Sequence, residues 1–278
     1  MKIRNVLTIA RKDWLEVRQN KAAWIPMLTV PAIFVVVLPL IFTLVIPALN
    51  VSPQDVLNSD ADITYFIEQM PPQLSQYVDL QKPMESMIVV MLGIMFAPMF
   101  LIMPLMFAST IAAESFAGER ERKTIEALLY TPASDADLFV GKLTAAAVPS
   151  IGITWVSFLV YTLILNLMPY ATFQRLWFPL PTWWPLIFWI TPALAILSIA
   201  VTVLISARVQ NFQGTYQLSS SLVILVVALF AGQLSGFLYL SVGIELLIGA
   251  LFWAAAFFLV YLAVQTFNRA SLISGRSD

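Results

Sequence analysis

Long stretches with almost no charged residue dominate this sequence. Six of them can be drawn, and each exceeds the roughly 20 residues that a helix needs to cross a bilayer. Lipid offers no hydrogen bonds, so only helices and closed barrels can span it, and these runs lack the alternation over about 10 residues that barrel strands show. We therefore predict an all-α polytopic membrane protein. Its six transmembrane helices are expected at residues 22–46, 86–113, 143–168, 184–206, 218–240 and 243–266.

Composition excludes several classes of function. Only 11% of the 278 residues are charged, against about 25% in soluble domains, and the net charge of -1 provides no basic field for nucleic acid. The absence of cysteine and histidine excludes disulfides, thiol nucleophiles and most transition-metal sites. An intramembrane enzyme would need paired carboxylates or a Ser–Lys pair in the membrane. Glu245 is the only charged residue well inside the six runs, so an enzyme is not expected.

Lysine and arginine predict the orientation. Of the 15 lysines and arginines, only Lys82 and Arg175 fall on one side of the six runs, and the other 13 fall on the opposite side. Because loops rich in lysine and arginine stay in the cytoplasm, we expect a multi-pass protein of the cytoplasmic (inner) membrane with both termini cytoplasmic. Residues 47–85 then form an external loop, and residues 22–278 form the transmembrane domain.

The first 21 residues form a separate amphipathic unit. Apolar residues recur at helical spacing from Ile3 to Val17, with a largely basic polar face between them. Such a helix lies along the surface of a bilayer. It fits either a lipid anchor or a lever between a cytosolic partner and the first span. The candidate residues of this interfacial helix are Arg11, Lys12, Asp13, Trp14 and Arg18.

The most polar stretch, residues 114–131, follows the second run. It is rich in good helix formers, and its oppositely charged residues stand four apart in the pairs Glu119–Lys123 and Arg122–Glu126. Pro132 ends the helix, because the residue before proline avoids the α region. Either a solvated loop or a rigid docking surface fits these features. Mixed charge with an apolar edge and defined ends favours the docking surface.

Other signals mark the remaining boundaries. Ser134 and Asp137 form a capping pair for the helix that leads into the third run. The connection between the last two runs is rich in glycine and serine and fits either a tight turn or two half-helices. Glu245 belongs there and is expected at the external interface or facing other parts of the protein, with a carboxylate of a transport pathway as the alternative. Prolines inside the runs indicate kinks, with hinges as the alternative.

The polar stretch resembles a known motif. "GERERKTIEALLYTPAS", followed by Gly141-Lys142, is similar to the cytosolic motif between the second and third spans of ABC type-2 transporter permeases. "ARKDWLEVRQNK" resembles the opening of that family, and "FNRASL" its exit sequence, with Ala270 where an acid is common. The six-span plan extends the resemblance over nearly the whole chain and implies the type V exporter fold.

The resemblance implies a permease half without its own motor. Two copies of a separate nucleotide-binding ATPase subunit would bind ATP and Mg²⁺, and a second permease half, expected to be a copy of this chain, would complete the pathway. The chain has no G-x-x-x-x-G-K-[ST] phosphate loop, so no cofactor is expected in it. The residues expected to couple to the ATPase are Glu114, Glu119, Arg120, Glu121, Arg122, Lys123, Thr124, Glu126, Leu128, Leu129 and Pro132.

The expected function is therefore ATP-driven export. The scarcity of charge within the spans indicates a hydrophobic or amphipathic substrate. A sodium-extruding permease remains an alternative, because kinked helices can offer carbonyl ligands. A non-transporting scaffold or channel subunit is the other alternative.

Overall fold

The computed structural model describes residues 3–45, 70–79, 82–122, 134–209 and 211–266. Within these ranges the chain is helical and contains no strand, which confirms the all-α prediction. Six helices are long and apolar enough to cross a membrane, and we number them as spans one to six. Their bounds are Met27–Val45, Ala97–Glu121, Ala136–Leu167, Trp183–Ser206, Phe212–Leu234 and Val242–Gln265.

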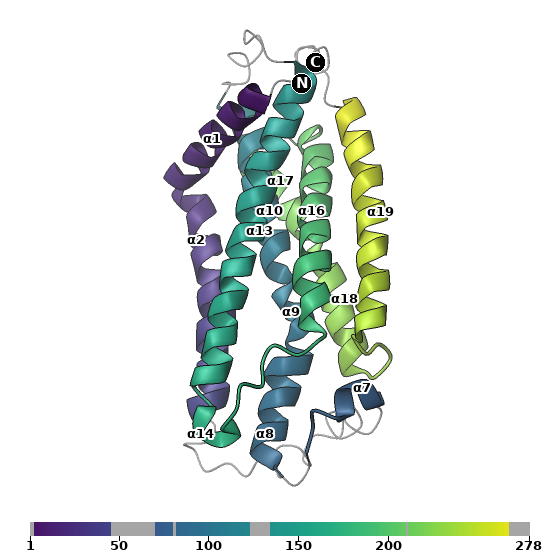
Figure 1. Ribbon diagram of the computed structural model, residues 1–278. Helices are drawn as coiled ribbons and strands as arrows, with labels where there is room; N and C mark the ends of the chain where they lie inside the picture. The colour runs from purple at the N-terminus through teal and green to yellow at the C-terminus, as the bar shows by residue number, and fades with distance from the viewer. Residues whose placement is uncertain (1–2, 46–69, 80–81, 123–133, 210, 267–278) are drawn as a thin grey trace.

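The spans form one upright bundle (Figure 1). Spans two and four are mostly buried, whereas spans one, five and six expose most of their surface. The helix α1 (Ile3–Gln19) leans against the first turns of α13 (Asp135–Leu167) at one end of the bundle. The last turn of α19 (Val242–Thr266) lies at this same end. We call it the α1 end.

Several spans are interrupted by π-helical segments, which carry the labels η1 to η5. Span one follows from α1 after Asn20, and its stretches are α2 (Lys21–Pro31), η1 (Ala32–Val37), α3 (Leu38–Leu40) and η2 (Ile41–Val45). Span two is preceded by α7 (Pro72–Ser75), α8 (Pro83–Ile88) and η3 (Val89–Met95), and consists of α9 (Ala97–Phe100), α10 (Ile102–Ala113), η4 (Glu114–Gly118) and α11 (Glu119–Glu121). The remaining elements are α14 (Tyr170–Phe173), α15 (Trp183–Pro185), η5 (Leu186–Ile190), α16 (Thr191–Ser206), α17 (Phe212–Ser220) and α18 (Val223–Leu234).

Local capping explains where the helices begin and end. Ser134 and Asp137 form the predicted capping box of α13, each side chain bonding the other's backbone N–H. Span five lies six residues before the predicted range, because the Asn211 side chain accepts a hydrogen bond from the Gly214 N–H and starts the helix there. Gly236, with φ of 70°, follows its end. The connection to α19 is a plain turn without half-helices.

Side chains of neighbouring spans bond the backbone carbonyl groups near the proline of α9. Pro98 carries no N–H, so the preceding turn keeps free carbonyl groups. Three carbonyls of η3 accept hydrogen bonds from side chains of α13, α15 and α18, which supports the kink reading rather than a hinge with open ligands. The pairs are Tyr161–Leu92 (2.8 Å), Trp183–Gly93 (2.7 Å) and Gln233–Ile94 (2.9 Å).

Candidate functional site

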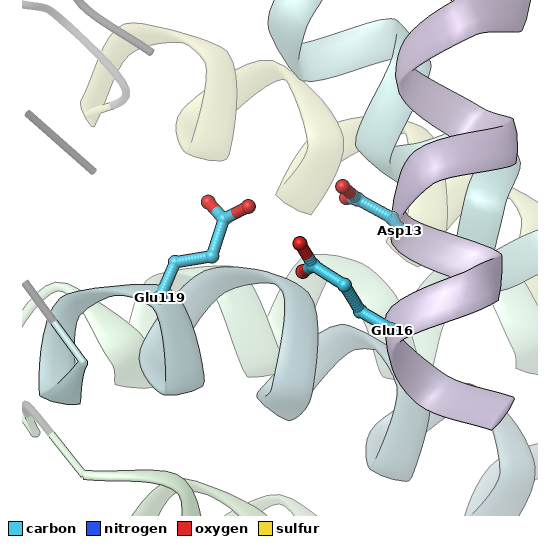
Figure 2. A group of neighbouring side chains, drawn as sticks. All are labelled: Asp13, Glu16 and Glu119. Atoms are coloured by element: carbon cyan, nitrogen blue, oxygen red, sulfur yellow. The ribbon is translucent and has the colours of Figure 1, made fainter. Parts of the chain in front are cut away.

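Charged side chains from three segments meet at the α1 end of the bundle. We call this cluster the hub. It comprises the charged residues Lys12, Asp13, Glu16, Glu119 and Lys142 together with Ser115, which bonds two of them. Figure 2 shows Asp13 and Glu16 reaching from α1 towards Glu119, which stands at the end of span two. Lys142 enters from the second turn of α13. The hub therefore joins α1, span two and span three.

Lys142 lies at the centre of the hub. Its side chain is only 2% exposed, and its two carboxylate partners, Asp13 and Glu119, are each 1% exposed. The ammonium donates to Glu119 Oε2 at 2.6 Å, to the Ser115 carbonyl at 2.6 Å and to Asp13 Oδ2 at 3.3 Å. Ser115 Oγ also donates to Asp13 Oδ2. A buried charge is tolerated only when it is paired and hydrogen-bonded, and Lys142 meets both conditions.

A second ammonium closes the hub on its solvent side. The carboxylates of Asp13, Glu16 and Glu119 lie within 4.8 Å of one another, a spacing that suits a metal ion. Lys12 Nζ contacts all three, at 3.5, 3.1 and 2.5 Å, so this ammonium occupies the place of a cation. Partial burial lowers the pKa of Lys12, but hydrogen bonds and charges, first those of Glu119, raise it more, and the net pKa lies above its usual value.

Gly141 explains how α1 comes so close to α13. A Cβ at this position would lie 2.9 Å from Ile9 Cβ and 3.3 Å from the Val6 carbonyl. Only glycine avoids this overlap, so the helix backbones approach closely here. The Gly-Lys pair of the motif thus has two physical roles: Gly141 admits α1, and the adjacent Lys142 neutralises the carboxylates that the approach buries.

Glu114 forms a second ion pair beside the hub. It is 2% exposed, accepts from Arg122 Nη1 at 2.7 Å, and accepts from Asn20 Nδ2 at 2.8 Å. Partial burial lowers the pKa of Arg122, whereas its hydrogen bond to Glu114 raises it, and the net pKa lies above the ordinary value. The hydrogen bond from Asn20 ties the junction of α1 and span one to Glu114 at the end of span two.

Two further motif residues reach spans four and five. Arg120 Nη1 donates to the carbonyl of Ser206, the last residue of α16, at 2.8 Å. The N–H of Phe212, the first residue of α17, donates to Glu121 Oε2 at 2.8 Å. A cation at a helix C-terminus and an anion at a helix N-terminus both satisfy free backbone groups and the helix dipole. The end of span two thus contacts four helices, α1, α13, α16 and α17, as well as Asn20 between α1 and α2.

The structure differs from the expected solvated helix in its first half. Residues 114–121 prolong span two, and Glu114 and Glu119 are buried in contacts within the chain. Glu121 and Arg122 are exposed. Arg11 is exposed and Trp14 is half-buried, whereas Asp13 is buried in the hub. The remaining expected residues lie outside the described part: Lys123, Thr124, Glu126, Leu128, Leu129, Pro132 and the side chain of Arg18.

Sequence reasoning missed several partners in this region. Asn20 and Ser206 are ordinary polar residues far from the motif in the sequence, and Ser115 lies in the polar stretch but carries no charge that marks it. Glu245 is not brought to the hub; it lies in the first turn of α19, at the opposite end of the bundle.

The helices indicate the general class of this protein. The described residues contain six apolar helices of membrane length, and a buried ion cluster joins two of them to α1, so this chain is a polytopic membrane protein. The model of a family described as "ABC-2 family transporter protein" matches residues 7–214. The chain therefore belongs to the ABC-2 transporter family and is a permease subunit of that kind of transporter. The matched residues include the whole hub. No curated protein and no solved structure matches the chain.

Proposed function

We propose that this chain couples ATP hydrolysis by a separate nucleotide-binding subunit to the export of a hydrophobic or amphipathic substrate. Two ATPase subunits would bind ATP and Mg²⁺, and a second copy of this chain would supply the other permease half. Family membership supports an ATPase as the kind of partner. The bias of lysine and arginine supports a cytosolic position for the α1 end.

The hub is the observation that carries the proposal. A displacement of the end of span two would be transmitted to span three through the ion pair of Glu119 with Lys142. It would be transmitted to α1 through the ion pair of Lys142 with Asp13. These contacts are buried, so water and salt screen them little. The junction is therefore stiff. A stiff junction would let the ATPase subunit move helices that it does not contact.

The exposed side of the same junction supplies the docking surface. Glu121 and Arg122 face solvent and stand immediately before residues 123–131 of the predicted docking helix. Charges of both signs on a partner surface would select the matching orientation. In this scheme the ATPase binds outside the hub, and the hub passes the displacement inward. The ATPase must have different affinities in its two states for this to shift the spans.

The apolar character of the spans supports the substrate class. Spans one, five and six expose long apolar faces, and the one carboxylate among the spans away from the hub, Glu245, is buried. A substrate that moves along or between such faces need not shed much hydration. We therefore place hydrophobic and amphipathic molecules before small ions.

Glu119→Gln tests the proposal in the complex reconstituted with its ATPase. Glutamine keeps the shape of the side chain but removes the charge that holds Lys142 and Lys12. We expect ATP hydrolysis to continue while ATP-dependent efflux of a fluorescent amphipathic dye from proteoliposomes falls at least tenfold. Glu85→Gln is the matched control: it weakens an ion pair with Lys82 at the opposite end and should leave both rates unchanged.

The same measurement distinguishes the alternatives. Dye movement without ATP would indicate a channel, and no stimulation of the ATPase by this chain would indicate a scaffold. Undiminished efflux per ATP hydrolysed in the Glu119→Gln complex would contradict the role of the hub.

A further inference from the structure

Glu245 is the one carboxylate of the described chain that is buried without any polar contact. It is 0% exposed, and neither of its oxygens has a hydrogen-bond partner among the described residues. It lies in the first turn of α19, within span six and at the end of the bundle opposite the hub. The burial comes from this chain alone, so no second copy is needed to cover it.

Two ordinary explanations do not account for this position. An acid near a helix N-terminus can cap free N–H groups, but the Glu245 oxygens accept no hydrogen bond. A buried acid can also be held by a cation, but α15, η5 and α16, which pack against α19, contain no ionisable residue. An ionised carboxylate without a partner is strongly disfavoured in such surroundings. A neutral carboxylic acid therefore suits this position better than a carboxylate does.

A cavity adjoins the turn that carries this acid. It has a volume of about 510 Å³, and its lining includes Val242, Gly243 and Ile244, the three residues before Glu245. Other lining residues come from the α7 region and from Pro181 and Thr182, which precede α15. The ionisable groups of this lining are the phenols of Tyr77 and Tyr239. Glu245 itself is absent from this lining, so the carboxyl group reaches the cavity only if the first turn of α19 moves.

One turn further along, α19 is closely packed. A Cβ on Gly249 would lie 2.2 Å from Trp189 Cδ1, so the indole ring rests directly on the helix backbone. The same ring donates from Nε1 to the Leu246 carbonyl at 3.1 Å. This contact fixes α19 to η5 on the hub side of Glu245. The cavity borders the residues before Glu245, whereas this contact lies after it along α19.

We propose that Glu245 is an intramembrane proton-binding site, loaded in this conformation and exchanging its proton with the adjacent cavity when the first turn of α19 moves away from α15. Binding converts a carboxylate and a proton into a neutral acid that fits the apolar seam. Release leaves a carboxylate that is stable only when water reaches it. The position of α19 and the protonation of Glu245 are thus linked, independently of any ATPase.

Carbodiimide labelling tests the site in the full chain reconstituted in lipid nanodiscs. Dicyclohexylcarbodiimide, which is lipid-soluble, modifies a carboxylic acid in its protonated form. We expect peptide mapping to find Glu245 labelled at neutral pH, with the yield falling at least tenfold as the pH is raised. Glu85, which pairs with Lys82 at 3.0 Å and with Arg175 at 3.8 Å, is the internal control and should stay unlabelled.

Infrared difference spectroscopy of wild type against Glu245→Gln provides a measurement that needs no access by a reagent. Glutamine resembles the neutral acid in shape and should fold, and the wild type should show a carboxylic-acid C=O band that the variant lacks. Absence of the band overturns the site. A band without labelling at any pH overturns the exchange with the cavity. Protection from the label by Na⁺ at constant pH overturns a proton site in favour of a cation site.

Discussion

Replacing Lys142 by methionine tests the energetics of the hub. Methionine fills most of the same volume but carries no charge, so Glu119 and Asp13, each 1% exposed, lose their buried partner. Removing one member of a buried ion pair costs about 3–5 kcal/mol, because the other charge is left uncompensated. Lys12 still contacts both carboxylates, which places the expected loss near the lower limit, at about 3 kcal/mol.

Equilibrium unfolding in mixed detergent micelles, followed by tryptophan fluorescence, measures this loss. The matched control is Lys82→Met, which breaks the pair with Glu85 at 3.0 Å on an exposed side chain and should cost below about 1 kcal/mol. The double variant Lys142→Met/Glu119→Gln should recover part of the loss, since it also removes one unpaired charge. Equal stabilities of Lys142→Met and Lys82→Met would refute the reasoning.

Three further changes have expected outcomes in the same assay. Gly141→Ala should cost about 1–3 kcal/mol because its Cβ overlaps α1, whereas Gly152→Ala, with no atom within 4 Å, should gain about 0.5–1 kcal/mol; equal effects would contradict the close approach. Trp183→Phe should cost about 1–3 kcal/mol by leaving a buried carbonyl unpaired, and Trp184→Phe, on an exposed ring, should be near neutral. The pKa of Lys12 is raised in the folded protein. The stability that Lys12 contributes is therefore fully present below the ordinary lysine pKa of about 10.4 and is lost only as the pH rises through the higher folded pKa. The loss of stability in Lys12→Met should thus be constant from about pH 7 to 9.

Local signals in the sequence predicted the number of spans and several of their boundaries, whereas span two begins 11 residues after its predicted start. The capping pair of Ser134 and Asp137 forms as expected, and spans four and six begin within one residue of their predicted starts. These features depend on hydropathy and on side chains that bond their own backbone, so neighbouring residues are enough to predict them. The predicted start of span five was wrong because the prediction counted apolar residues alone, whereas the helix begins at the Asn211 cap.

Long-range pairing could not be read in the same way. Glu119 has an equally good partner four residues away in the sequence, and nothing there indicates that it turns inward to Lys142, 23 residues on. That choice depends on the approach of α1 at Gly141, a packing event between distant segments. The burial of Glu114 has the same origin. The role of the motif in ATPase coupling stays a prediction.

Photo-crosslinking at Arg122 tests whether an ATPase subunit docks beside the hub. This arginine is 46% exposed beside the hub, and Arg175, 70% exposed at the opposite end, is the matched control. A benzophenone amino acid would replace each in turn in native membranes, and adducts would be identified by mass spectrometry. We predict that position 122 captures a subunit with a nucleotide-binding phosphate loop and that position 175 does not. No such adduct at position 122, or an equal yield at both positions, would contradict it.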